Sequence, residues 1–105
     1  MVSRGSDPVY DLLEQYVNRV YVDNSKRLQL YTINALQLFD LGARHYKAKD
    51  YPKAYTILKR FVHLYNDLQK HNAAGLKTYQ RDMFKLKERG PLAMDMVESC
   101  LEKLR

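Results

Sequence analysis

The hydrophobic residues of this chain recur at the three- and four-residue spacing of α-helices, and no stretch alternates as a strand does. Asp7 and Pro8 begin the first predicted helix, because aspartate accepts hydrogen bonds from free amide groups and proline fits a first turn. A second predicted helix runs from Ser25 to about Ala48, and Asp50 caps a third. The apolar positions of the third helix follow the helical period closely: Ala54, Ile57, Leu58, Phe61, Leu64, Tyr65 and Leu68.

The second and third predicted helices are joined by the short link 47–50, which permits only an antiparallel hairpin. The second helix is apolar on more than one side, since Leu30, Ile33, Leu36 and Leu41 widen its main stripe. A helix of this kind has to be covered on more than one side. We therefore expect it to lie centrally or at an interface.

Beyond the hairpin, residues 71–75 form a predicted loop, and residues 76–89 form a shorter helix with many charges. Gly90 and Pro91 predict a break followed by a last helix. The fold class is therefore all-α, a bundle of about five helices built on the antiparallel hairpin. With 105 residues, 4 glycines and 3 prolines, the chain is long enough for one domain, over residues 1–105, in which residues 7–22 form a peripheral or dimerising first helix.

The net charge of +6 is concentrated in one part of the chain. Residues 25–60 hold eight basic and two acidic residues, while the rest of the sequence is neutral. A local excess of this kind favours an acidic partner, either a peptide, a membrane face or a nucleic acid, although ordinary solvated helix faces give the same pattern.

The sequence holds no recognisable catalytic or cofactor-binding motif. Its glycines stand alone, its serines form no pair with a base, and His45, His63 and His71 lack the spacing of metal ligands. The single cysteine, Cys100, fits a structural role in a reducing compartment. No apolar run is long enough for a membrane span or a signal peptide. We therefore expect a soluble cytoplasmic protein that is not an enzyme and has no cofactor, no metal and no small-molecule substrate.

One strip of the third helix is a candidate partner-binding surface. Tyr51, Tyr55 and Val62 fall at the edge of its core face on the helical wheel, and Lys59 lies slightly beyond them. Aromatic and apolar side chains beside a basic rim suit a groove that accepts a partner helix. Packing of this strip against the first or last helix of the same chain remains open as an alternative.

The hairpin resembles the MIT-like N-terminal dimerisation domain of endosomal deubiquitinases, and more closely the ubiquitin-specific protease UBPY than the metalloprotease AMSH. The likeness is strongest from Ala54 to Leu68 and covers residues 28–70 well. The residues that carry it are Ala35 to Phe39, Gly42, Ala43 and Tyr46 in the second helix, and Asp50, Tyr51, Ala54, Tyr55 and Phe61 to Asn66 in the third. A basic run over residues 77–89 is denser than this family pattern.

The resemblance implies a non-catalytic domain that recruits its deubiquitinase to endosomes. It also implies binding to the acidic C-terminal helices of ESCRT-III subunits, the charged multivesicular body (CHMP) proteins, together with self-association. Such helices match the positive charge of residues 25–60. The catalytic boxes of a thiol or a metallo deubiquitinase are absent from these 105 residues.

Three alternatives remain open from the sequence. A homodimerisation module without peptide binding would pack the first helix across a two-fold axis onto the second. A tetratricopeptide hairpin has similar small and aromatic spacing, but no second copy of the motif recurs along the chain. Nucleic-acid binding by the basic stretch is disfavoured, because the sequence lacks a recognition-helix motif or an arginine-rich face.

Overall fold

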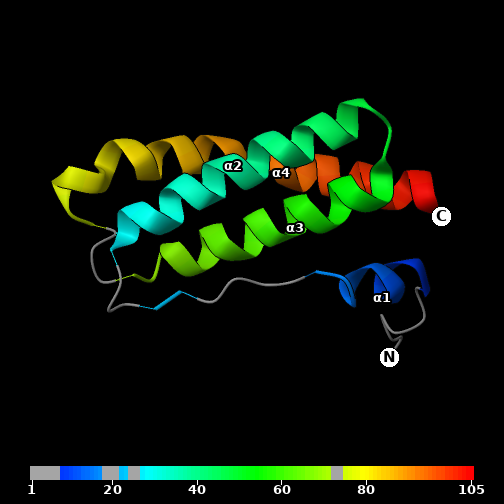
Figure 1. Cartoon of the computed structure of the whole chain (residues 1–105), viewed down its shortest axis with the longest axis horizontal. Coiled ribbons are helices and arrows are strands. Elements are labelled where there is room, and N and C mark those ends of the chain that lie inside the picture. The colour runs from blue at the N-terminus through cyan, green and yellow to red at the C-terminus, as the bar shows by residue number, and fades with distance from the viewer. Residues whose placement is uncertain (1–7, 18–21, 24–26, 72–74) are drawn as a thin grey trace.

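A computed structural model describes residues 8–17, 22–23, 27–71 and 75–105, and among them it contains helices and no strand. The elements are α1 (Pro8–Glu14), α2 (Leu28–Lys47), α3 (Tyr51–Leu68), the 3-10 helix η2 (Lys77–Tyr79) and α4 (Gln80–Leu104). The three long helices form a bundle in which α3 runs antiparallel to both α2 and α4 (Figure 1). The short α1 lies on the other side of α3 from α2 (Figure 1).

The core lies where α2, α3 and α4 meet. Phe61 is at its centre, fully buried, with its ring centroid 5.4 Å from that of Phe39 in an edge-to-face arrangement and 6.3 Å from that of Tyr65 in a stacked one. Other fully buried apolar side chains come from all three long helices: Leu28, Ala35, Ala54, Tyr55, Leu58, Leu64, Leu68, Leu86, Ala93 and Cys100. The predicted amphipathic periods of the second and third helices therefore correspond to this shared core.

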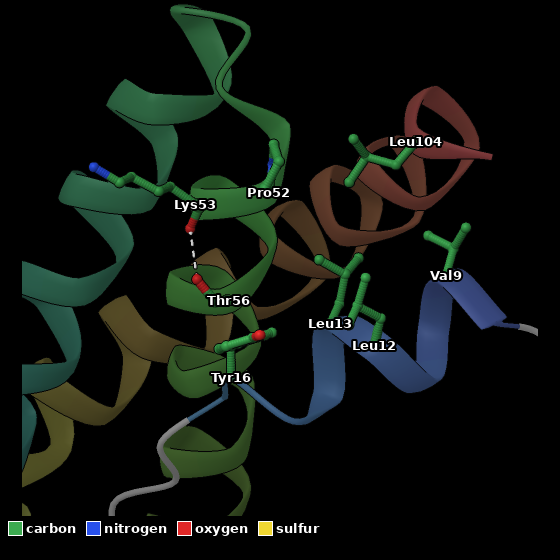
Figure 2. Close-up of a pocket in the computed structure, with 8 residues that line it drawn as sticks. All are labelled: Val9, Leu12, Leu13, Tyr16, Pro52, Lys53, Thr56 and Leu104. Atoms are coloured by element: carbon green, nitrogen blue, oxygen red, sulfur yellow. Dashed lines mark hydrogen bonds between the residues drawn. The ribbon is translucent and has the colours of Figure 1, made fainter.

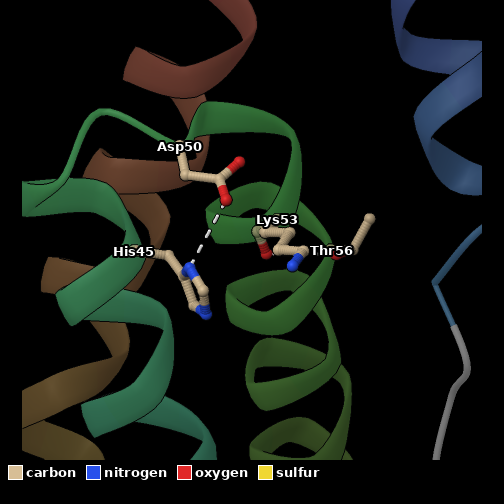
Figure 3. A network of polar contacts seen from close by, with 4 residues as sticks. All are labelled: His45, Asp50, Lys53 and Thr56. Atoms are coloured by element: carbon tan, nitrogen blue, oxygen red, sulfur yellow. Dashed lines mark hydrogen bonds and ion pairs between the residues drawn. The ribbon is translucent and has the colours of Figure 1, made fainter.

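The predicted antiparallel hairpin is confirmed, and a tight turn closes it. Lys49 adopts a positive φ of 64°, and the backbone amide of Asp50 donates to the carbonyl of His45 at 2.9 Å. Asp50 is the N-cap residue of α3, as predicted, but its carboxylate makes no capping hydrogen bond. Its Oδ2 instead lies 3.6 Å from Nδ1 of His45, so the side chains tie the two ends of the turn together (Figure 3).

Gly42 brings α2 unusually close to α3. A Cβ atom built on Gly42 would lie 2.6 Å from both Cγ and Cδ2 of Leu58 and 3.3 Å from Cγ2 of Ile57. Real Cβ atoms essentially never lie as close as 2.6 Å to another heavy atom of this kind, so the absence of a side chain at this position permits the close approach of the two helices.

The predicted break at Gly90 and Pro91 is wrong, because α4 continues through both residues to Leu104. The described residues therefore form four α-helices rather than about five. Proline usually forces the residue before it out of the helical region, because its ring meets that residue's Cβ. Gly90 has no Cβ, and the space beside it is filled by the ring of Tyr65, 3.2 Å from a Cβ built there. Burial of Leu86, Ala93 and Val97 holds the two halves of the helix in line.

The first helix is shorter than the predicted 7–22, since α1 ends at Glu14. The amides of Tyr16 and Val17 bond the carbonyls of Leu13 and Glu14, and this three-residue spacing tightens the chain into a turn. The remainder of the prediction over residues 18–21, together with the proposed caps at Asp7 and Ser25, lies outside the described residues.

Candidate protein-interaction site

Tyr55 and Lys59, two residues of the predicted contact strip on α3, contact α1. Tyr55 is fully buried and Val62 nearly so, while Tyr51 is half-buried. The side chain of Lys59 is only 16% exposed. In this structure α1, a helix of the same chain, covers part of the strip that was predicted to bind a partner.

A carboxylate of α1 contacts two of the predicted residues. The hydroxyl of Tyr55 donates to Oε2 of Glu14 at 2.6 Å, and Nζ of Lys59 lies 3.9 Å from the same oxygen. The Lys59 ammonium is also 5.4 Å from the ring centroid of Tyr10 and 5.7 Å from that of Tyr55. A hydrogen bond to a charged acceptor contributes about 1.5–3 kcal/mol. Glu14 therefore makes a strong polar contact between α1 and α3.

Apolar side chains hold the rest of α1. Leu13 is buried, and Val9 and Leu13 point from α1 toward Leu104 at the end of α4 (Figure 2). They leave an apolar pocket of about 440 Å³, lined by Val9, Leu12, Leu13, Tyr16, Pro52, Lys53, Thr56 and Leu104. A seven-residue helix is too short to be stable alone, so the contacts with α3 and α4 are what keep α1 helical.

The groove between α3 and α4 continues beyond α1. A second cavity of about 480 Å³ lies there, lined by Val62, Tyr65, Asn66, Lys87, Gly90, Pro91 and Met94. Val62 follows Tyr55 by seven residues, two turns along the same side of α3. Among the described residues, α1 thus fills one end of the α3/α4 groove, and a cavity remains at the other. Gly90 and Pro91, where the sequence predicts a helix break, form part of the wall of this second cavity.

The structure separates Tyr51 from the other three predicted residues. Its ring packs edge-to-face on Tyr46 of α2, with centroids 5.8 Å apart. The hydroxyl of Tyr46 in turn donates to Ser99 of α4 at 2.8 Å. Tyr51 therefore belongs to the end of the bundle where the hairpin turn lies, whereas Tyr55, Lys59 and Val62 follow the α3/α4 groove.

Comparison with known protein families covers almost the whole chain. The family model of the USP8 dimerisation domain matches residues 7–105. The chain belongs to this family. No curated protein and no solved structure gave a match. The resemblance to a deubiquitinase dimerisation domain is therefore confirmed at the level of the family.

The USP8 dimerisation domain match begins at residue 7, so it takes in α1 as well as the bundle. Sequence analysis did not find the two residues of α1 that contact Lys59. Tyr10 and Glu14 are four residues apart and thus lie on one face of a helix, which was the available signal. Tyr55 lies 41 positions after Glu14 in the sequence. Only the folded chain therefore shows which basic or aromatic residues Tyr10 and Glu14 contact.

The described part of this USP8 dimerisation domain contains no candidate metal site and no candidate membrane-spanning helix. Among those residues, no three histidine, cysteine or carboxylate side chains gather as metal ligands would. None of the helices described is both long and apolar enough to cross a bilayer. Cys100 is fully buried, and desolvation raises the pKa of its thiol from 9.0 to about 11. This thiol is therefore protonated at neutral pH, when it is a weak nucleophile.

Proposed function

We propose that this chain is a non-catalytic self-association domain of a USP8-type deubiquitinase. The observation that carries the proposal is the match of the USP8 dimerisation domain over residues 7–105. Exposed apolar side chains on a small bundle support it, because large apolar patches on soluble proteins usually mark sites of association. Self-association would place two copies of the parent enzyme side by side.

Sedimentation equilibrium over a range of protein concentrations tests self-association directly. We expect the average mass to rise from 12.4 kDa toward twice that value as the concentration is raised through the micromolar range. A mass that stays at 12.4 kDa up to several hundred micromolar would contradict the proposal.

A second role is favoured by the way Glu14 is bound. We infer that the α3/α4 groove also accepts an acidic amphipathic helix from an ESCRT-III subunit, which would recruit the enzyme to endosomes. The sequence supports this through the positive charge of residues 25–60. The structure supports it because α1 itself is a short apolar helix whose carboxylate sits on Tyr55 and Lys59. The proposed contacts remain Tyr51, Tyr55, Lys59 and Val62.

In this second role the partner helix takes the place of α1. Its carboxylate replaces that of Glu14, and its apolar residues continue into the open end of the groove beside Val62 and Met94. Tyr51 then contacts only the end of the partner that lies near the hairpin turn. Because α1 competes for the groove, the affinity measured for a partner is lower than the groove alone would give.

Weakening α1 therefore has a distinctive expected result. Glu14→Ala removes the charged acceptor of Tyr55, so we expect it to tighten binding of an acidic ESCRT-III helix by about tenfold or more. Lys59→Glu should abolish that binding. Titration calorimetry with C-terminal peptides of several ESCRT-III subunits measures both effects. Asp95→Ala is the matched control, since it removes one negative charge from an exposed position on α4 and should leave affinity unchanged.

Two results would exclude this second role. Equal affinity of the wild type and Glu14→Ala would mean that the peptide does not use the Glu14 position. Equal binding to the ESCRT-III helices, to a scrambled peptide of the same composition and to a DNA duplex would mean that only net charge is recognised. Neither result bears on self-association, which is measured without peptide.

A further inference from the structure

The outer face of α2 carries apolar side chains that no other described element covers. Leu30, Ile33 and Leu41 are 60%, 48% and 40% exposed. With Gln37 they follow one line along the helix at spacings of three and four residues. This line lies opposite the side that faces the core, where Leu28, Ala35, Leu38 and Gly42 are buried.

Helix α4 meets α2 on a different side from this apolar line. Arg89 of α4 lies over the ring of Phe39 in α2, with its Cζ 5.7 Å from the ring centroid, and Ser99 accepts from Tyr46 in α2. Phe39 and Tyr46 lie on the side of the helical wheel opposite Gln37. We call Leu30, Ile33, Gln37 and Leu41 the α2 face.

The first helix does not cover the α2 face. One alternative from the sequence has the first helix of a second chain packing on α2. In the structure, α1 instead packs on α3 and α4 of its own chain, across the bundle from α2 (Figure 1). The Glu14 contacts with Tyr55 and Lys59 hold it there. No described element of the chain covers the α2 face, which leaves its apolar side chains accessible to a second molecule.

We propose that the α2 face is the self-association surface, on which two copies of α2 pack antiparallel about a two-fold axis near Gln37. This rests on the proposed self-association and specifies where it occurs. A second copy is the partner that the family description names, and an isologous interface needs one patch that complements itself. The apolar line on α2 meets this need, because its apolar residues lie on both sides of Gln37.

Charge favours the antiparallel direction. Arg44 lies at the end of the apolar line, seven residues beyond Gln37, and is exposed. In a parallel pair the two Arg44 side chains would meet, and like charges in an interface oppose association. In the antiparallel pair they are separated by about 21 Å along the helices, from a rise of 1.5 Å per residue. Each then lies near the Leu30 end of the other α2.

Charge substitutions in the α2 face test this assignment by sedimentation. The double variant Ile33→Glu, Leu41→Glu should weaken the dimer by at least tenfold, with the circular dichroism spectrum unchanged because both residues are exposed. Phe84→Glu is the matched control, since Phe84 is 58% exposed on α4 but lies outside the α2 face, and it should leave the dimer intact. A monomeric wild type would refute self-association itself. A dimeric wild type with an equally dimeric double variant would overturn only the assignment of the surface.

Cysteine cross-linking tests the direction of packing. Gln37→Cys should form a disulfide-linked dimer on mild oxidation, whereas Leu30→Cys should not, because its two copies lie about 21 Å apart along the antiparallel helices. The wild type is the control, because its Cys100 is buried. Cross-linking at both positions would overturn the antiparallel arrangement. Cross-linking at neither position, or loss of the dimer in Leu12→Glu on α1 but not in the double variant, would overturn the α2 face.

Discussion

Phe61→Ala is expected to lower the free energy of unfolding by about 3–5 kcal/mol. Phe61 is fully buried and contacts the rings of Phe39 in α2 and Tyr65 in α3, so its removal leaves a cavity where the long helices meet. Each kcal/mol corresponds to about 4–8 °C in a domain of this size, so the melting temperature should fall by at least about 12 °C. Thermal and urea unfolding at one fixed protein concentration measure the effect, since association makes stability depend on concentration.

Phe84→Ala is the control for this substitution. Phe84 has the same side chain but is 58% exposed on α4, so its truncation should change the free energy of unfolding by no more than about 0.5 kcal/mol. A small loss at Phe61, similar to that at Phe84, would mean that the three long helices do not meet around Phe61 as described.

Gly42→Val is expected to lower the free energy of unfolding by about 2–3 kcal/mol, and Gly42→Ala by about 1 kcal/mol. Alanine gains helix propensity over glycine, about 1 kcal/mol, but its methyl group would lie 2.6 Å from Leu58 and force α2 away from α3. Valine adds two further methyl groups to this overlap. Urea unfolding of the variants measures the loss. Gly75→Ala is the control, since nothing lies within 4 Å of a Cβ built there.

A change of sign in a double-mutant cycle would identify the contact responsible. Leu58→Ala removes the atoms nearest to Gly42 and destabilises the protein on its own. In that background Gly42→Ala should stabilise by about 1 kcal/mol, because the added methyl group fills space and helix propensity rises. If Gly42→Ala destabilised both backgrounds equally, the close approach of α2 and α3 would not be the cause.

The sequence predicted the hairpin and the core face of α3 well, because these depend on local patterns. The helical period places Phe61, Leu64 and Leu68 on one side, and the short link before Tyr51 leaves only an antiparallel neighbour. The break at Gly90 was mispredicted for the converse reason. The expectation that proline ends a helix uses only neighbouring residues in the sequence. The continuity of α4 also involves packing against Tyr65, a distant residue that no local pattern predicts.

The site was predicted in part. The helical wheel placed Tyr55, Lys59 and Val62 along one side of α3, which is the side that faces the α3/α4 groove. It also placed Tyr51 there, although that ring packs on Tyr46 across the hairpin. The wheel could not show that Glu14 of the same chain fills the position expected of a partner's carboxylate. Helical geometry fixes which residues share a face, and only tertiary packing decides what covers that face.

The α3/α4 groove and the α2 face lie on opposite sides of one bundle, and this arrangement determines the valency of a dimer. When two copies join through α2, their grooves point away from each other, so both cannot bind the same flat surface. Such a dimer would bridge two separate arrays of partner helices and would gain little avidity on either one. Its architecture would therefore be that of a cross-linker.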